Sequence, residues 1–156
     1  DIKKITIRTY KGVIGKHDTK NITGQYAAKM SIPFSVVLTL IKGNAGIDDY
    51  SDENVNNPNI TALTNKVFIE ADDELSLLVP NKRVAILEID LGNNLILTER
   101  VDYPKGEPEN PITNADMEEK FRNLSVFSGK SQEESDEIIF KVWNIEKEFI
   151  NLFELL

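Results

Sequence analysis

The sequence RVAILEIDLGNNLILTERVDYPKGEPENPIT, residues 83–113, predicts the centre of the fold. Two apolar runs, Arg83 to Leu91 and Leu95 to Val101, flank Gly92-Asn93-Asn94, which are residue types that tolerate positive φ. This pattern is typical of a β-hairpin of two antiparallel strands. A proline-rich loop closes the second strand, and Thr113 then opens a helix. The stretch therefore predicts an α+β fold with a mainly antiparallel sheet.

Upstream of the hairpin, the pattern predicts a strand and a buried helix. Ile2 to Val13 is rich in β-branched residues interrupted by charges, which favours a strand with one solvated face. Tyr26 to Lys42 is largely apolar, with Ser31 as a plausible N-cap and Gly43 as the stop. Its β-branched residues would also suit a buried strand, but its length and its Ser-Pro start favour a helix.

Shorter elements are predicted between the buried helix and the hairpin. Turn residues surround a short helical piece near Asp52, a second short helix is expected from Ile60 to Asn65, and Lys66 to Ala71 looks like a strand. The sheet should therefore contain strands from both halves of the first 101 residues.

Two helices are predicted at the C-terminal end. The first begins at Thr113, with Asp116 forming a capping-box-like start, and runs to about Leu124. The second begins at Ser131 and carries apolar residues at helical spacing: Ile138, Ile139, Val142, Ile145, Phe149, Leu152 and Phe153. Because a lone surface helix needs less apolar surface, we expect this helix to pack on the chain's own sheet or on another domain.

Composition excludes several classes of protein. A length of 156 residues with 40% hydrophobic content allows one domain with a core. A net charge of −8 argues against a nucleic-acid or anionic-membrane partner, and the absence of cysteine excludes disulfides and thiolate chemistry. No run approaches the roughly 18 apolar residues of a membrane helix, and the start Asp1-Ile2-Lys3-Lys4 lacks the apolar stretch of a signal peptide. We expect a cytoplasmic protein.

Few residues could carry chemistry. His17 is the one histidine, and on a polar loop it could act as a general acid or base or be a solvated bystander. Lys29 and Ser31 precede the predicted helix, whose free N–H groups could bind a carboxylate ligand; a surface charge and an N-cap are the structural alternatives. Lys105 lies in another loop that could bind a carboxylate ligand. The structural alternative is that this loop is simply a strained turn.

Two acidic clusters do not have the spacing of a metal site. Asp48/Asp49/Asp52/Glu53 and Asp72/Asp73/Glu74 lack the alternating ligands, central glycine and distal glutamate of an EF-hand loop. Helix capping and solvated turns explain them better, so no metal is expected. The sequence also lacks a phosphate-binding loop and the common nucleophile motifs.

Several ordered motifs resemble the C-terminal small domain of the MmgE/PrpD family: KMSIPFS at 29–35, GIDDY at 46–50, RVDYPKGEPENPIT at 100–113 and MEEKFR at 117–122. The resemblance implies a lyase or isomerase that moves a proton next to a carboxylate of a small polycarboxylate, without metal or organic cofactor. Dehydration of the 2-methylcitrate type is expected first, with decarboxylation or epimerisation open. A tyrosine used in the decarboxylase branch falls at Ile14 in our register, which weakens that assignment.

The resemblance also implies partners. A larger helical domain of the same polypeptide would precede this part and carry the main acid-base residues, so the chain alone should be inactive, and a homodimer is expected. The missing initiator methionine agrees with a fragment, although processing of a small complete protein would look the same. The resemblance implies that residues 1–112 form the small domain, a two-layer sandwich with helices on one face of the sheet. We expect residues 113–156 to be helices that pack on it or on the helical domain. The alternative is a stand-alone binding or assembly domain without catalysis.

Overall fold

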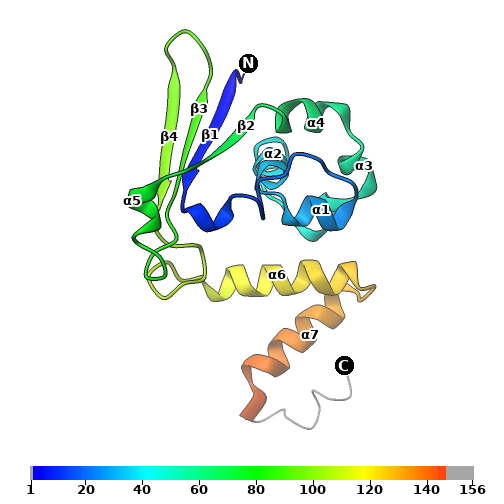
Figure 1. Cartoon of the computed structure of the whole chain (residues 1–156). Coiled ribbons are helices and arrows are strands. Elements are labelled where there is room, and N and C mark those ends of the chain that lie inside the picture. The colour runs from blue at the N-terminus through cyan, green and yellow to red at the C-terminus, as the bar shows by residue number, and fades with distance from the viewer. Residues whose placement is uncertain (1, 147–156) are drawn as a thin grey trace. The chain divides into compact units, whose positions relative to one another are not determined.

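The computed structural model describes residues 2–146 and has an α+β fold. A mixed four-stranded sheet has the order β2-β1-β3-β4 (Figure 1). Its strands are β1 (Lys4–Thr9), β2 (Val67–Ala71), β3 (Ala85–Asp90) and β4 (Ile96–Val101). β1 pairs in parallel with β2, whereas β1–β3 and β3–β4 are antiparallel. The predicted α+β class with a mainly antiparallel sheet is confirmed.

The hairpin forms where the sequence predicts it. Gly92, Asn93 and Asn94 all have positive φ, at 80°, 52° and 62°, which explains why glycine and asparagine occupy the turn. β4 is an edge strand with one neighbour, and all six of its residues are exposed.

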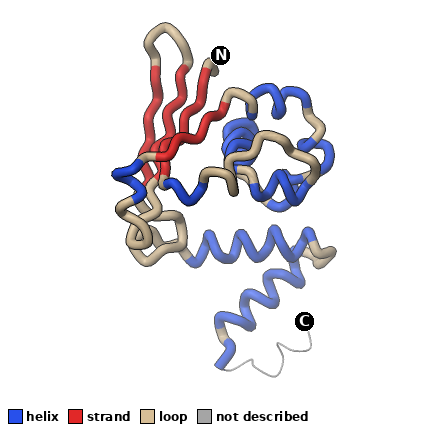
Figure 2. Tube along the Cα trace, in the orientation of Figure 1, coloured by secondary structure: helices blue, strands red, loops and turns tan. Residues whose placement is uncertain are grey.

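Four helices, α1 (Gln25–Met30), α2 (Ile32–Lys42), α3 (Asp52–Val55) and α4 (Pro58–Thr64), lie on one side of the sheet (Figure 2). Alternation along the strands sends Ile5, Ile7, Val67 and Ile89 into one core with α2. Phe34, Val37 and Leu38 are the α2 residues of that core, each at most 1% exposed. This core holds α2 against the sheet and thereby positions the N-terminal end of α2.

The buried helix predicted to begin after Ser31 is α2, and the residues before Ser31 form a separate helix, α1, which the sequence pattern did not predict. Ser31 separates the two helices with extended backbone (φ −97°, ψ 112°) and caps α2 by accepting from the Phe34 amide at 3.2 Å. Pro33 in the first turn and Gly43 in the left-handed region mark the start and stop as predicted. The preceding helix, α1, ends one residue earlier.

Short elements complete this part of the chain. The 3-10 helices η1 (Lys11–Val13) and η2 (Ile47–Tyr50) follow β1 and precede α3, and the single turn α5 (Asp73–Ser76) follows β2. Leu75 of α5 joins Val84 and Ile86 in a smaller apolar cluster. Because Ile86 points away from the face of Leu87, this cluster lies on the sheet face opposite the main core.

The chain divides into two compact units, Asp1–Asn110 and Pro111–Leu156. The described part of the second unit is a hairpin of α6 (Asn114–Phe127) and α7 (Gln132–Trp143). Both helices begin with the predicted cap, Thr113 with Asp116 and Ser131 with Glu134. The predicted apolar positions from Phe149 to Leu156 lie outside the described residues. No helix that the structure describes is long and apolar enough to cross a membrane.

Candidate functional site

The loop after β1 folds back onto the junction between α1 and α2, which we define as Met30–Ile32. The Ile32 amide donates to the His17 carbonyl at 2.9 Å. The Ser31 hydroxyl donates to the Thr19 carbonyl at 2.6 Å. Two of the residues predicted from sequence, His17 and Ser31, are thus brought together by bonds that span more than ten residues.

The His17 ring has a defined orientation at this junction. Its Nδ1 lies 3.2 Å from the Met30 carbonyl oxygen, and the imidazole is half-buried. Since a carbonyl oxygen only accepts, this contact requires the proton on Nδ1. The neutral ring then has a lone pair on Nε2, the nitrogen that can accept a proton from a ligand. The geometry is therefore compatible with a general base, as the sequence predicts.

Lys29 and Ser31 differ in what they can offer a ligand. Lys29 is exposed in the last turn of α1, directly beside the start of α2. Ser31 is only 1% exposed, and its hydroxyl is occupied by the Phe34 amide and the Thr19 carbonyl. Lys29 can reach a ligand without displacing protein contacts, whereas Ser31 as placed holds the junction together. Direct substrate binding by Ser31 stays a prediction.

Lys105 lies in a different loop, Tyr103–Asn110, which we call the proline loop. This loop leaves the sheet at the same end as the His17 segment, because Thr9, Ala85 and Val101 are paired across β1, β3 and β4. Gly106 in the loop has a φ of 106°, a backbone conformation that favours glycine. Lys105 itself is exposed.

Side chains before β3 hold the proline loop, and the sequence analysis did not identify them. Lys82 Nζ lies 2.8 Å from Asp102 Oδ2 and 5.1 Å from the centre of the Tyr103 ring. Arg83 pairs with Glu107 at 3.6 Å. In the sequence, these contacts are indicated only by two adjacent cations and an acidic loop. That pattern does not show which charges pair with which.

The charges around Asp102 shift its titration. Hydrogen bonds from Lys82 and then Arg100 lower the pKa of the Asp102 carboxyl below its ordinary value. The hydrogen bond to Asp102 likewise raises the pKa of Lys82. Asp102 therefore remains a carboxylate and Lys82 a cation over the whole range near neutral pH.

A polar cavity of about 210 Å³ separates the proline loop from the segment before β3. Pro80, Asn81 and Arg83 line one side, and the loop residues Tyr103, Pro104, Glu107, Pro108 and Glu109 line the other. The cavity means that the loop is not packed tightly against its neighbour.

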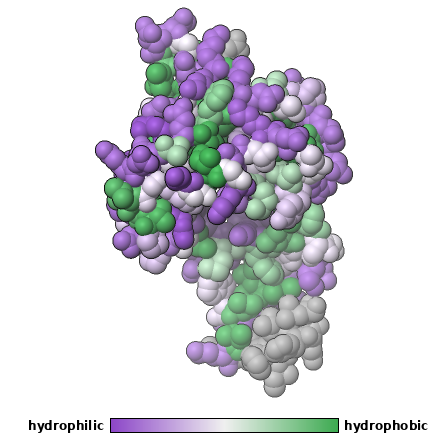
Figure 3. All heavy atoms as spheres, in the orientation of Figure 1, coloured by the Kyte–Doolittle hydropathy of each residue, from purple (hydrophilic) through white to green (hydrophobic). Residues whose placement is uncertain are grey.

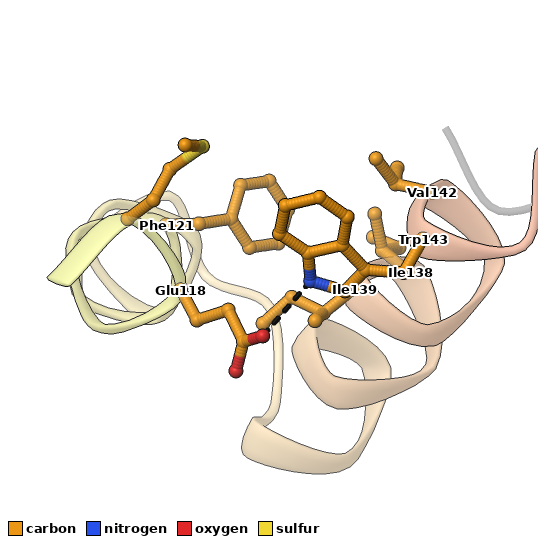
Figure 4. Close-up of a pocket in the computed structure, with 7 residues that line it drawn as sticks. Glu118, Phe121, Ile138, Ile139, Val142 and Trp143 are labelled. Atoms are coloured by element: carbon orange, nitrogen blue, oxygen red, sulfur yellow. Dashed lines mark hydrogen bonds between the residues drawn. The ribbon is translucent and has the colours of Figure 1, made fainter. Parts of the chain in front are cut away.

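An apolar pocket of about 120 Å³ lies within the second unit, between α6 and α7 (Figure 4). Met117, Phe121, Ile138, Ile139, Val142 and Trp143 line it together with Glu118. The Trp143 indole N–H donates to Glu118 Oε1 at 2.8 Å, so the one carboxylate of the pocket is already engaged. This pocket suits an apolar side chain rather than a polycarboxylate.

The acidic clusters act in helix capping. Asp49 accepts from the Gly46 amide at 2.8 Å, and Asp72 accepts from the Leu75 amide at 3.0 Å at the start of α5. Among residues 2–146, no group of three or more metal-ligating side chains could hold an ion.

Comparison with known proteins identifies the family. Residues 1–145 match the family described as the MmgE/PrpD C-terminal domain. The chain is 35% identical over 112 residues to "2-methylcitrate dehydratase, mitochondrial" of Yarrowia lipolytica, and 35% identical over 112 residues to "Probable 2-methylcitrate dehydratase" of Saccharomyces cerevisiae. Each alignment covers 68% of this chain and 22% of the relative, so the chain spans about a fifth of the length of these relatives. The chain belongs to the MmgE/PrpD family, as a C-terminal domain.

Proposed function

We propose that this chain is the C-terminal domain of an MmgE/PrpD lyase or isomerase that acts on a small polycarboxylate, with dehydration of the 2-methylcitrate type as its reaction. The observation that carries the proposal is the 35% identity to two relatives named 2-methylcitrate dehydratase, within a family match over residues 1–145. The His17 segment and the proline loop leave the sheet at the same end, which supports the proposal.

In this proposal the domain forms one wall of the substrate cleft. Lys29 and Lys105 are exposed cations that bind substrate carboxylates, and the positive end of α2 beside Lys29 adds to the attraction. Ser31 fixes the junction from which Lys29 projects, and His17 contributes Nε2 for proton transfer. The remaining acid-base groups belong to the helical domain of the same polypeptide, so the chain alone is inactive.

The exposed apolar residues of α6 and α7 support a helical partner. Phe127, Phe140 and Trp143 are each at least 50% exposed, and Figure 3 shows apolar side chains on the surface of this hairpin. We propose that they pack against the preceding helical domain, in an enzyme that is a homodimer. A cytoplasmic location belongs to the same proposal, although the Yarrowia relative has "mitochondrial" in its name.

The exposed apolar hairpin equally favours a second candidate, a non-catalytic assembly domain of the same fold. The two candidates differ in the region before Asp1. A helical segment with a histidine-rich end would support the enzyme, and a start codon next to Asp1 would support the assembly domain.

Kinetics of the complete polypeptide test the proposed site. Lys29→Ala and Lys105→Ala should each raise KM for 2-methylcitrate about tenfold, since a charge-assisted hydrogen bond contributes about 1.5–3 kcal/mol. Lys42→Ala is the control, because Lys42 is exposed at the opposite end of α2. Unchanged KM in both variants, or an equal rise for the control, would remove the two lysines from the site.

A further inference from the structure

The proline loop, Tyr103–Asn110, carries Lys105 but has almost no packing of its own. None of its eight residues is buried, and a cavity of about 210 Å³ lies between it and the segment before β3. Apolar burial therefore cannot fix its position, and polar contacts must do so.

Those polar contacts are of two kinds. Inside the loop, the Gly106 amide donates to the Asn110 carbonyl at 2.8 Å, and the Asn110 side-chain amide donates to the Tyr103 carbonyl at 2.9 Å. These bonds give the loop its shape. Lys82 and Arg83, which precede β3, contribute contacts that attach the loop to the rest of the unit.

Of these two cations, Lys82 makes the shorter and more specific contacts. Its ammonium lies 2.8 Å from Asp102, the residue that leads into the loop, and 5.1 Å from the Tyr103 ring centre. The Arg83–Glu107 pair is longer, at 3.6 Å, and its Arg83 side chain is 51% exposed. Lys82 also connects the start of β3 to the end of β4 across the end of the sheet.

We propose that Lys82 is a positioning residue that holds the proline loop, and through it Lys105, in the geometry that binds a substrate carboxylate. The inference rests on the proposed function of Lys105. Lys82 does not touch the substrate; its ammonium fixes where the loop leaves the sheet. Loss of this contact loosens the loop, so that its internal hydrogen bonds open more often and Lys105 is no longer held in place.

The test uses variants of the complete polypeptide with 2-methylcitrate as substrate. Lys82→Ala should raise KM about two- to fivefold with little change in kcat, the range expected for one partly exposed ion pair. Lys82→Arg keeps the charge and the ring contact and should restore most of the affinity. Lys4→Ala is a matched control, since Lys4 pairs with Glu70 at 3.6 Å and lies 5.2 Å from the Phe68 ring centre, but at the other end of the sheet.

A double variant separates this inference from the proposed function. If Lys82 acts through Lys105, Lys82→Ala should add little to the KM of Lys105→Ala, because the two changes disrupt one interaction. Additive effects, or an equal effect of Lys4→Ala, would overturn the positioning role. Unchanged KM in Lys105→Ala would instead refute the proposed substrate contact of Lys105, and the positioning role of Lys82 with it.

Hydrogen exchange supplies a readout that needs no activity. The Gly106 amide, which donates to Asn110, should exchange faster in Lys82→Ala than in the unmodified protein or in Lys4→Ala. The same exchange rate in all three proteins would contradict the inference even if the enzyme proved to use another substrate.

Discussion

The two units of this chain contrast in how much apolar surface they bury. Of the fifteen buried hydrophobic residues among those described, fourteen lie in the sheet-containing unit and one, Ile138, lies in the α6–α7 hairpin. The hairpin instead exposes Phe127, Phe140 and Trp143. Two helices alone bury little apolar surface, so we expect the hairpin to gain stability from further packing, whereas the first unit has a core of its own.

Local polar contacts connect the two helices of the hairpin. Arg122 reaches Glu118 at 3.2 Å and Asp136 at 2.6 Å, which connects α6 to α7. Hydrogen bonds to Asp136 raise the pKa of Arg122, with a smaller contribution from Glu118. Such surface pairs add little stability each, so they define the hairpin's geometry more than its free energy of unfolding. In the first unit, buried apolar residues supply the stability. In the hairpin, surface ion pairs define how the two helices are arranged but contribute little to the free energy of unfolding.

The largest effect is expected from removing a core side chain of the first unit. Phe34 is 1% exposed in the centre of that core, so Phe34→Ala should lower the free energy of unfolding by about 3–5 kcal/mol. Phe140→Ala removes an aromatic ring that is 61% exposed and should change it by about 0.5 kcal/mol or less. Denaturant unfolding of both variants measures the difference. Similar losses in the two variants would contradict the contrast.

A smaller difference is expected between the N-caps of the two units. Ser31→Ala removes the cap of α2 and the partner of the Thr19 carbonyl inside a buried junction, and should cost about 2 kcal/mol. Ser131→Ala removes an exposed cap of α7 and should cost about 0.5–1 kcal/mol. Thermal unfolding followed by circular dichroism compares them. An equal cost would show that burial of the Ser31 junction adds nothing.

The smallest expected effect is a loss of α7 stability at acidic pH. A hydrogen bond from the Ser131 amide lowers the pKa of Glu134 below its ordinary value of 4.5. The stabilisation is therefore complete above that ordinary value and is lost as pH falls through the lower folded value. Glu134→Gln should lose less helical signal than the unmodified chain between about pH 7 and about pH 3.

Glu133→Gln is the control for this titration. Glu133 lies in the same first turn of α7, so its replacement removes a charge but leaves the capping box of Ser131 and Glu134 intact. Acid profiles that are the same for both variants would show that the cap of α7 does not depend on the Glu134 carboxylate.

Local features of the fold could be predicted from the sequence. The β3–β4 hairpin, the cap at Ser31 and the capping boxes at Thr113 and Ser131 depend on residues within a few positions of one another. The helix α1 was not predicted, because its N-cap position is Gly24, which offers no side-chain cap that the sequence could reveal. The one-turn helix α5 was missed as an element, although its capping carboxylate, Asp72, was interpreted as a cap.

In the site, too, residue types could be predicted from the sequence, whereas tertiary contacts could not. Residue types and their places at loops and a helix start indicated His17, Lys29, Ser31 and Lys105, and their roles stay predictions. That His17 contacts the Met30 carbonyl follows from a fold-back of the chain that no local pattern encodes. Lys82 and Asp102 are twenty residues apart, and only the pairing of β3 with β4 brings them together.

Turnover of 2-methylcitrate by this chain alone and by the complete polypeptide tests the central claim most directly. The claim is that the sheet-containing unit folds by itself and supplies His17 and carboxylate-binding loops, while the remaining acid-base groups and the partner of the α6–α7 hairpin belong to the rest of the enzyme. We predict dehydration by the complete polypeptide and none by this chain, which should nevertheless show the circular dichroism of a folded protein. Turnover by this chain alone would contradict the claim, as would a complete polypeptide that is folded but inactive on 2-methylcitrate.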